Sequence, residues 1–172
     1  MNLKSSDFEL FGLAQKFKQD RAAIDTRWKE LQREAHPDRF AALGASAQRI
    51  AMQWSVRINE AYRRLKDPLQ RAIYLCGLNG AAVSVEDNTA MPADFLIQQI
   101  EWREALEDAK SSENLHEMAS QSTEFAHKLL SKIEHEIDIR NDFGRAVEYI
   151  RALMFVERFN AEVDMRIDQL QQ

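Results

Sequence analysis

The chain has 172 residues, 45% of them hydrophobic and 30% charged, which is the balance of a folded soluble protein. Its five glycines and three prolines are too few for an all-β sandwich or barrel, which needs a turn about every 8–12 residues. The net charge of −5 argues against a general nucleic-acid-binding protein, and the single cysteine excludes both an intramolecular disulfide and a cysteine-based zinc site.

The sequence does not indicate export or membrane insertion. The N-terminal residues, MNLKSSDFELFG, lack the basic-then-apolar profile of a signal peptide. The longest apolar stretches, near residues 72–78 and 152–156, are far shorter than the ~20 residues that a membrane-spanning helix needs. We therefore expect a cytoplasmic protein that binds neither membranes nor nucleic acid, and we expect it to be a monomer.

Helical periodicity dominates the first half of the chain. A helix is predicted over residues 20–35, and Pro37 ends it because the residue before a proline is pushed out of the α region. A loop is expected up to Gly44, followed by a long helix over 46–66 and a short one over 68–77. The apolar face of the first helix carries Ile24, Trp28, Leu31 and Ala35. The inner face of the long helix is predicted to carry Ile50, Trp54, Ile58, Ala61, Tyr62 and Leu65.

A small, polar and weakly periodic segment, NGAAVSVEDNTA, separates the two halves of the chain. Such composition is typical of a linker. We therefore assign residues 1–78 to an N-terminal domain, 79–91 to a linker and 92–172 to a C-terminal domain.

Three helices are predicted in the C-terminal domain. The first starts at Pro92, Ser111 and Ser112 cap the second, and Asn141 caps the third. Short connections between helices favour an antiparallel bundle. The predicted fold class is thus all-α, with a helical N-terminal domain and a C-terminal antiparallel three-helix bundle.

Two Glu-x-x-His pairs could suggest a metal site. Glu113 with His116 and Glu124 with His127 match the pattern found in carboxylate-bridged di-iron bundles, which place the two copies on different helices. Here both copies fall on one predicted helix, about 16 Å apart at ~1.5 Å per residue. They cannot share a metal, and we expect solvated polar positions.

No other motif indicates catalysis. Cys76 sits in an apolar helical segment and reads as a small buried thiol. The sequence contains no glycine-rich phosphate loop and no nucleophile or zinc-protease signature. We expect no cofactor, no metal and no enzymatic activity; a helical metal-dependent oxidase is a much weaker alternative, and a purely structural scaffold has no positive support.

The tripeptide His36-Pro37-Asp38 is the most informative motif. Proline stiffens the turn and removes a backbone donor, so the flanking imidazole and carboxylate can project outward. A helix ends just before the tripeptide, a loop of about ten residues follows, and a helix with Tyr62 and Leu65 near its end returns antiparallel.

This arrangement resembles the J-domain of DnaJ-type co-chaperones over roughly residues 5–78. Within that group it is most similar to the HscB family, the J-proteins of iron–sulphur cluster biogenesis, in its bacterial form without an N-terminal zinc module. The segments that carry the resemblance are HPDRF at 36–40, INEAY at 58–62, Leu65, Pro68 and RAIYL at 71–75.

The resemblance implies a co-chaperone rather than an enzyme. The J-domain would dock on a DnaK-type, HscA-like chaperone, and His36, Pro37 and Asp38 would help to trigger that partner's ATP hydrolysis. The C-terminal bundle would bind the iron–sulphur scaffold protein and deliver it as client. A general J-domain co-chaperone with a different client remains the alternative.

The helix before the tripeptide, a basic docking face in the family, has mixed charge here. We expect its charge contacts to come from Arg27, Lys29 and Arg33, together with Arg39 beside the loop. The same helix also carries Asp25, Glu30 and Glu34.

The first helix of the bundle is predicted to have two faces. At 100° per residue, Phe95, Gln99, Trp102, Leu106 and Ala109 form an ordinary core stripe. A second face is apolar at its start and acidic further on, which is common in binding surfaces. By resemblance to the family, the residues of this face and one on the last helix would bind the scaffold: Leu96, Ile97, Ile100, Glu101, Glu104, Asp108 and Phe155. The alternative is that Leu96 and Ile100 simply broaden the core.

Overall fold

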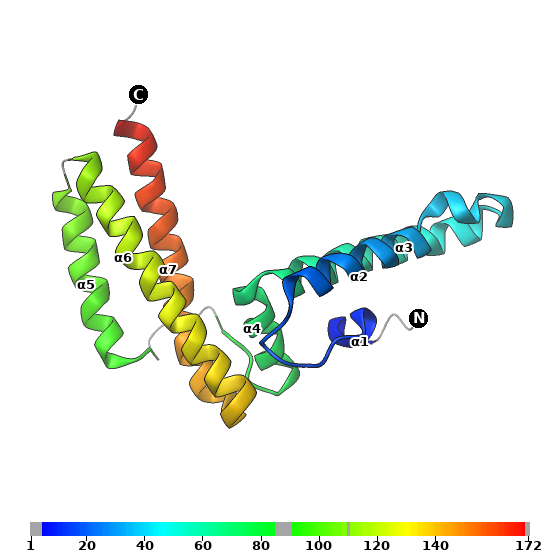
Figure 1. Ribbon diagram of the computed structural model, residues 1–172, viewed down its shortest axis with the longest axis horizontal. Coiled ribbons are helices and arrows are strands. Elements are labelled where there is room, and N and C mark those ends of the chain that lie inside the picture. Colours follow the sequence, from blue (N-terminus) through cyan, green and yellow to red (C-terminus); the bar gives the residue numbers. More distant parts are fainter. Residues whose placement is uncertain (1–4, 85–90, 110, 171–172) are drawn as a thin grey trace. The chain divides into compact units, whose positions relative to one another are not determined.

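The computed structural model describes residues 5–84, 91–109 and 111–170, and every regular element in these ranges is helical (Figure 1). The all-α prediction is therefore confirmed. Of the predicted linker over 79–91, residues 85–90 lie outside the described residues.

The structure divides into two compact units, residues 1–75 (unit 1) and 76–172 (unit 2). This division lies before the predicted linker, inside the helix that precedes it. One reason is that the buried Cys76 Sγ lies 3.9 Å from the carbonyl oxygen of Phe143, so the last turn of that helix packs with the C-terminal half.

Unit 1 contains the helices predicted over 20–35 and 46–66 and most of the one predicted over 68–77, together with two short helices that were not predicted, Asp7–Phe11 and Pro37–Leu43. Its elements are α1 (Asp7–Phe11), α2 (Arg21–Glu34), η1 (Pro37–Leu43), α3 (Ala45–Lys66) and the start of α4 (Pro68–Leu78). The Asp20 side chain caps α2 by accepting a hydrogen bond of 2.9 Å from the Ala22 amide. The hairpin of α2 and α3 thus forms where the apolar periodicity predicted it.

The segment after Pro37 is a 3₁₀-helix, η1, where the sequence predicted an irregular loop. Proline is suited to the first turn of a helix because its fixed φ matches and its missing amide has no partner there. Gly44 then adopts a φ of 90°, a conformation that favours glycine, and the chain turns into α3.

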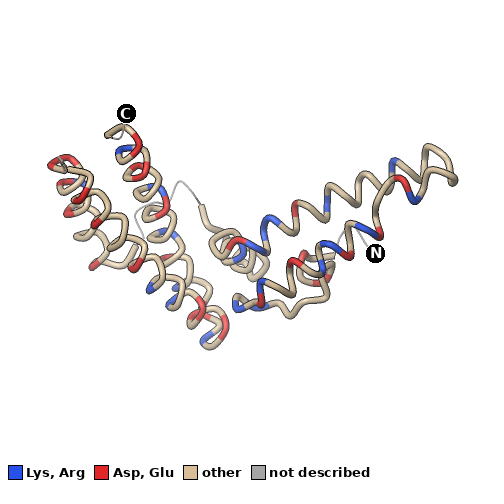
Figure 2. Tube along the Cα trace, turned by 45° about the horizontal axis from the view of Figure 1, so that its top comes forward, with Lys and Arg blue, Asp and Glu red and all other residues tan. Residues whose placement is uncertain are grey.

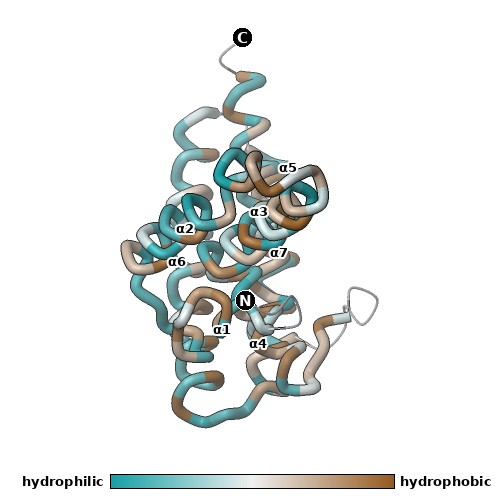
Figure 3. The backbone as a smooth tube through the Cα atoms, turned by 90° about the vertical axis from the view of Figure 1, so that its right-hand side faces the viewer, coloured by the Kyte–Doolittle hydropathy of each residue, from teal (hydrophilic) through white to brown (hydrophobic). Residues whose placement is uncertain are grey.

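The core of unit 1 contains the apolar faces of α2 and α3. Figure 3 shows hydrophobic and hydrophilic residues mixed along the backbone of the helices. Trp28 and Tyr62 stack with ring centroids 4.6 Å apart, as their predicted faces require. Ile50 was predicted to be a core residue, but it is exposed, and Trp54 is half-buried. The reason is length: α3 has 22 residues and α2 only 14, so the first turns of α3 extend past the end of α2.

A buried charge cluster that no local sequence pattern predicts joins α1 to α3. The Asp7 carboxylate is fully buried and forms ion pairs of 2.6 Å with Arg57 and 3.2 Å with Arg64. The Asp7 amide donates to the hydroxyl of Tyr74 at 3.0 Å, and the Arg64 guanidinium lies over the Tyr74 ring. Removing one member would leave uncompensated charge inside the unit.

Unit 2 contains three long helices, and a short π-helical segment connects the second to the third. Its elements are α5 (Ala93–Asp108), α6 (Ser112–Glu134), the π-helical segment η2 (His135–Arg140) and α7 (Phe143–Leu170). One predicted detail is wrong. Asn141 does not cap α7: with a φ of 53° it ends η2, while the side chain of Asp142 accepts a 2.9 Å hydrogen bond from the Arg145 amide.

Aromatic rings join α5 to the other two helices of the bundle. Phe95 of α5 lies 5.5 Å from Phe125 of α6 and 5.7 Å from Phe155 of α7, measured between ring centroids. Trp102 lies 5.4 Å from Phe125 and stacks on Phe159 at 5.1 Å. Because α6 and α7 approach each other most closely, these large side chains fill the wider space beneath α5.

Candidate interaction surfaces

The predicted tripeptide lies at the end of the α2–α3 hairpin and is open to solvent. The side chains of His36 and Asp38 are 58% and 90% exposed. The Asp38 amide donates to His36 Nδ1 at 3.3 Å, and the Arg39 guanidinium donates to the carbonyl of Arg33 at 3.1 Å. The turn is therefore held by hydrogen bonds within the 36–39 segment and to the end of α2, and its exposed imidazole and carboxylate can contact another molecule.

The four basic side chains predicted to contact the chaperone differ in whether they form ion pairs within the chain. Arg27 forms ion pairs with Glu30 at 3.0 Å and with Glu34 at 3.8 Å, so its charge is partly neutralised on the helix itself. Lys29, Arg33 and Arg39 are exposed. Figure 2 shows the basic and acidic residues alternating along α2. The exposed cations are thus better placed than Arg27 to meet a partner.

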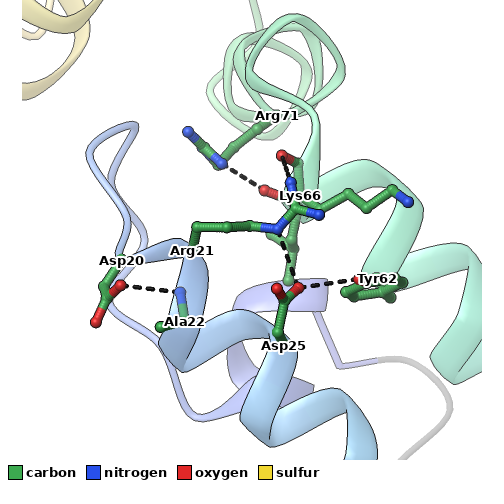
Figure 4. Close-up of polar contacts among 8 residues, drawn as sticks. Asp20, Arg21, Ala22, Asp25, Tyr62, Lys66 and Arg71 are labelled. Carbon is green, nitrogen blue, oxygen red and sulfur yellow. Dashed lines mark hydrogen bonds and ion pairs between the residues drawn. The ribbon is translucent and has the colours of Figure 1, made fainter.

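A polar cluster at the other end of α2 fixes this helix against α3 (Figure 4). The Asp25 carboxylate accepts hydrogen bonds from the Tyr62 hydroxyl at 2.9 Å and from Arg21 at 3.0 Å. The Tyr62 hydrogen bond and then the Arg21 hydrogen bond lower the pKa of Asp25. Arg21 also donates to the carbonyl of Lys66 at 3.3 Å. The register of the hairpin, and hence the position of its tip, is held by these contacts.

Beside the tip lies an apolar pocket of about 570 Å³ that sequence reasoning missed. It is lined by side chains of η1 and α3, including Phe40, Leu43, Ile50 and Trp54. Leu43 and Ile50 are exposed. The signal was present as apolar residues in the predicted loop and at the start of α3, but their exposure depends on the unequal helix lengths described above.

The predicted second face of α5 is exposed. Leu96 is 41%, Ile97 62% and Ile100 60% exposed, so they do not broaden the core. Glu101, Glu104 and Asp108 are also exposed. The opposite face buries Phe95, Trp102 and Leu106, as predicted. The helix therefore presents an apolar strip that continues into acidic side chains.

Phe155 does not belong wholly to this exposed face. Its ring is half-buried, lies 5.7 Å from Phe95 and stacks on Phe159 at 6.3 Å. The guanidinium of Arg103 lies 5.7 Å above its centroid. Phe155 and Ile100 line the same groove between α5 and α7. Phe155 is thus an edge residue, with one part in the core and another accessible from outside.

The candidate catalytic groups have ordinary structural surroundings. Burial raises the pKa of the Cys76 thiol to about 11, which makes it a poor nucleophile. Glu124 forms a 2.8 Å ion pair with Lys128, which lowers the pKa of Glu124. Across the described ranges, no three His, Cys, Asp or Glu side chains converge as metal ligands, and no helix there is long and apolar enough to cross a membrane.

Comparison with known proteins identifies the family. The family model described as the HSCB C-terminal oligomerisation domain matches residues 91–164. The co-chaperone protein HscB homolog of Burkholderia thailandensis is 45% identical over 174 residues, covering 99% of both chains. The chain belongs to the HscB family of co-chaperones. The homolog of Burkholderia multivorans is 44% identical with the same coverage.

Two solved HscB structures share the fold. The chaperone HscB from Vibrio cholerae superposes with a TM-score of 0.83 at 32% identity, covering 96% of this chain and 99% of the other. The human co-chaperone HscB superposes with a TM-score of 0.90 at 24% identity, covering 96% and 84% respectively. HscB membership thus confirms the resemblance drawn from the tripeptide and from the 58–62 and 71–75 segments.

Proposed function

We propose that this co-chaperone of iron–sulphur cluster assembly uses its two units for two partners. Unit 1 would bind a DnaK-type, HscA-like chaperone and stimulate its ATPase, and unit 2 would bind the iron–sulphur scaffold protein as client. The observation that carries the proposal is that each unit exposes a distinct interaction surface on a fixed framework. One is the stiff polar tip at His36 and Asp38; the other is the apolar strip of α5.

On unit 1, His36, Pro37 and Asp38 act as the trigger, and Lys29, Arg33 and Arg39 supply charge contacts to the chaperone. Arg27 contributes less, because Glu30 and Glu34 already pair with it. Exposed charges of this kind act mainly on association rate and its salt dependence.

On unit 2, Leu96, Ile97 and Ile100 are the apolar anchors for the scaffold, with Phe155 contributing the exposed part of its ring. The acidic residues Glu101, Glu104 and Asp108 steer a basic region of the scaffold into register. An apolar centre with a charged rim is the usual anatomy of a protein interface.

The protein acts in the cytoplasm as a monomer, without a cofactor or catalytic activity of its own. The HscB homologs that this chain resembles are named co-chaperones, which supports this proposal. ATP hydrolysis would take place on the chaperone, and this chain would control its rate and its client.

Chaperone stimulation by unit 1 is tested by the steady-state ATPase rate of an HscA-like chaperone, measured with the parent protein and with His36→Gln. We expect the variant to lose stimulation while circular dichroism stays unchanged, because the side chain is exposed and contributes nothing to the core. Lys128→Gln, an exposed change on unit 2, is the matched control and should stimulate normally. Normal stimulation by a folded His36→Gln protein would refute the assignment.

The alternative, a general J-domain co-chaperone with another client, makes the same prediction for His36. It differs in unit 2, because the purified iron–sulphur scaffold protein would then fail to bind.

A further inference from the structure

The groove beside the apolar strip has a polar side that the proposed function does not use. The groove has a volume of about 440 Å³ and lies between α5 and α7. Ile100 and the exposed part of Phe155 form its apolar side. Arg103 of α5 and Arg158 of α7 also line it, with Glu162 as the acidic residue of the lining set, so its charge is net positive.

Both arginines have donors to spare. The Arg103 guanidinium carbon lies 5.7 Å from the centroid of the Phe155 ring, and a contact with an aromatic ring does not use up the hydrogen-bond donors of the cation. Within the described ranges, the hydrogen bond that Arg158 donates runs from Nε to the carbonyl of Met154 at 3.3 Å. Among the described residues, no carboxylate lies within ion-pair distance of either guanidinium.

Charge is unevenly divided across the apolar strip. At 100° per residue, Arg103 lies about 60° to one side of Ile100, whereas Glu101, Glu104 and Asp108 lie roughly 40–100° to the other side. Glu107 lies about 20° to the side of Arg103, but it does not line the groove. An acidic group on a partner is repelled on the side of the glutamates and attracted on the side of the arginines. The division also fixes orientation, since a partner turned by 180° would place like charges together.

We propose that Arg103 and Arg158 form a carboxylate-binding site, which receives an Asp or Glu of the scaffold next to the apolar side chain that fills the groove. The proposal rests on the proposed function, because it names the chemistry of the scaffold segment that unit 2 binds. Guanidinium groups suit this task, since their planar fork binds a carboxylate through two parallel hydrogen bonds. Phe155 supports it by holding Arg103 in place.

The test is titration of the purified iron–sulphur scaffold protein against the full chain. We expect Arg103→Gln and Arg158→Gln each to weaken binding about five- to tenfold, and to reduce its salt dependence. Lys128→Gln, which removes one exposed cation elsewhere on unit 2, should change binding less than about twofold. Circular dichroism checks that each variant is folded. If removing Arg103, which contacts the Phe155 ring, changes the shape of the groove, Arg158→Gln alone tests the proposal.

The partner group is then identified by a double-mutant cycle. Each acidic residue of the scaffold is changed to its amide, and one of these changes should cause no further loss in the Arg103→Gln background. If the parent and Lys128→Gln bind the scaffold and both arginine variants bind equally well, the carboxylate site is refuted while the proposed function stands. Additive losses for every acidic residue would refute it too. If the parent itself does not bind, both proposals fail.

Discussion

Unit 1 and unit 2 hold their interaction surfaces in place by different means. In unit 1 polar contacts set the geometry: Asp7 joins α1 to α3, and Asp25 joins α2 to α3. In unit 2 the position of α5 depends on rings such as Phe95 and Trp102. Polar contacts depend on direction and protonation, whereas aromatic packing depends on filled volume. The two surfaces should therefore fail under different perturbations.

The largest expected effect is on the aromatic packing of unit 2. Phe95→Ala should destabilise unit 2 by about 3–5 kcal/mol, because it removes a buried ring and leaves a cavity. Ile97→Ala, on the exposed face of the same helix, should stay within ~0.5 kcal/mol. The measurement is denaturant unfolding followed by Trp102 fluorescence, with Trp28 and Trp54 replaced by Phe in every protein. Similar losses for both variants would contradict the two-faced description of α5.

The next effect concerns the buried charge of unit 1. Asp7→Asn should lower the free energy of unfolding of unit 1 by roughly 3 kcal/mol. This value is at the low end for breaking a buried ion pair, because Arg57 and Arg64 retain some solvent contact. Asp38→Asn, which neutralises an exposed aspartate of the same unit, should leave stability nearly unchanged. Denaturant unfolding of unit 1, followed by Trp28 and Trp54 fluorescence with Trp102 replaced by Phe, tests this. Equal stability of the two variants would show that the Asp7 cluster does not fix α1.

A third prediction separates binding from stability on α5. Leu96→Ala and Ile100→Ala should each weaken scaffold binding by about 2 kcal/mol, roughly thirtyfold, with little loss of stability. Phe155→Ala should reduce both quantities, since its ring is shared between the core and the groove. Scaffold titration beside unfolding measures the two effects. Several kcal/mol of lost stability for Leu96→Ala would place that side chain in the core instead.

The smallest effect tests the polar anchor of the hairpin. The pKa of Asp25 is lower than its ordinary value of 3.8, so its ionised form stabilises the fold above about pH 4, and this contribution is lost as pH falls through the folded-state pKa. Tyr62→Phe removes the main cause of the shift. The variant should show a flatter dependence of unfolding free energy on pH below 4 than the parent. An unchanged slope would mean that Asp25 does not contribute to acid sensitivity.

Sequence periodicity was sufficient for the helices and for most of the exposed surfaces. It placed Leu96, Ile97 and Ile100 outside the core because one helix can bury only one face, and it placed His36 and Asp38 at a turn because Pro37 ends α2. The family followed from local motifs, which need no knowledge of distant contacts.

What the sequence could not provide depends on residues far apart in the chain. Asp7 and its arginine partners are 50 and 57 positions apart, and no local pattern pairs them. The exposure of Ile50 depends on where α2 stops, and the half-burial of Phe155 depends on its contact with Phe95. The π-helical turn after Glu134 likewise has no signature in the periodicity of α6.

The most direct test of the two-partner account is the ATPase rate of an HscA-like chaperone, measured with this protein and the scaffold separately and together. We predict that the two together stimulate more than the sum of each alone. His36→Gln should abolish all stimulation by this protein. The Leu96→Ala/Ile100→Ala double variant should keep the stimulation by this protein alone and lose only the extra stimulation with scaffold. Two results would contradict the use of two units for two partners. In the first, the double variant and the parent give the same ATPase rate with the scaffold present. In the second, the rate with the parent and the scaffold together shows no more stimulation than the sum of the two separate stimulations.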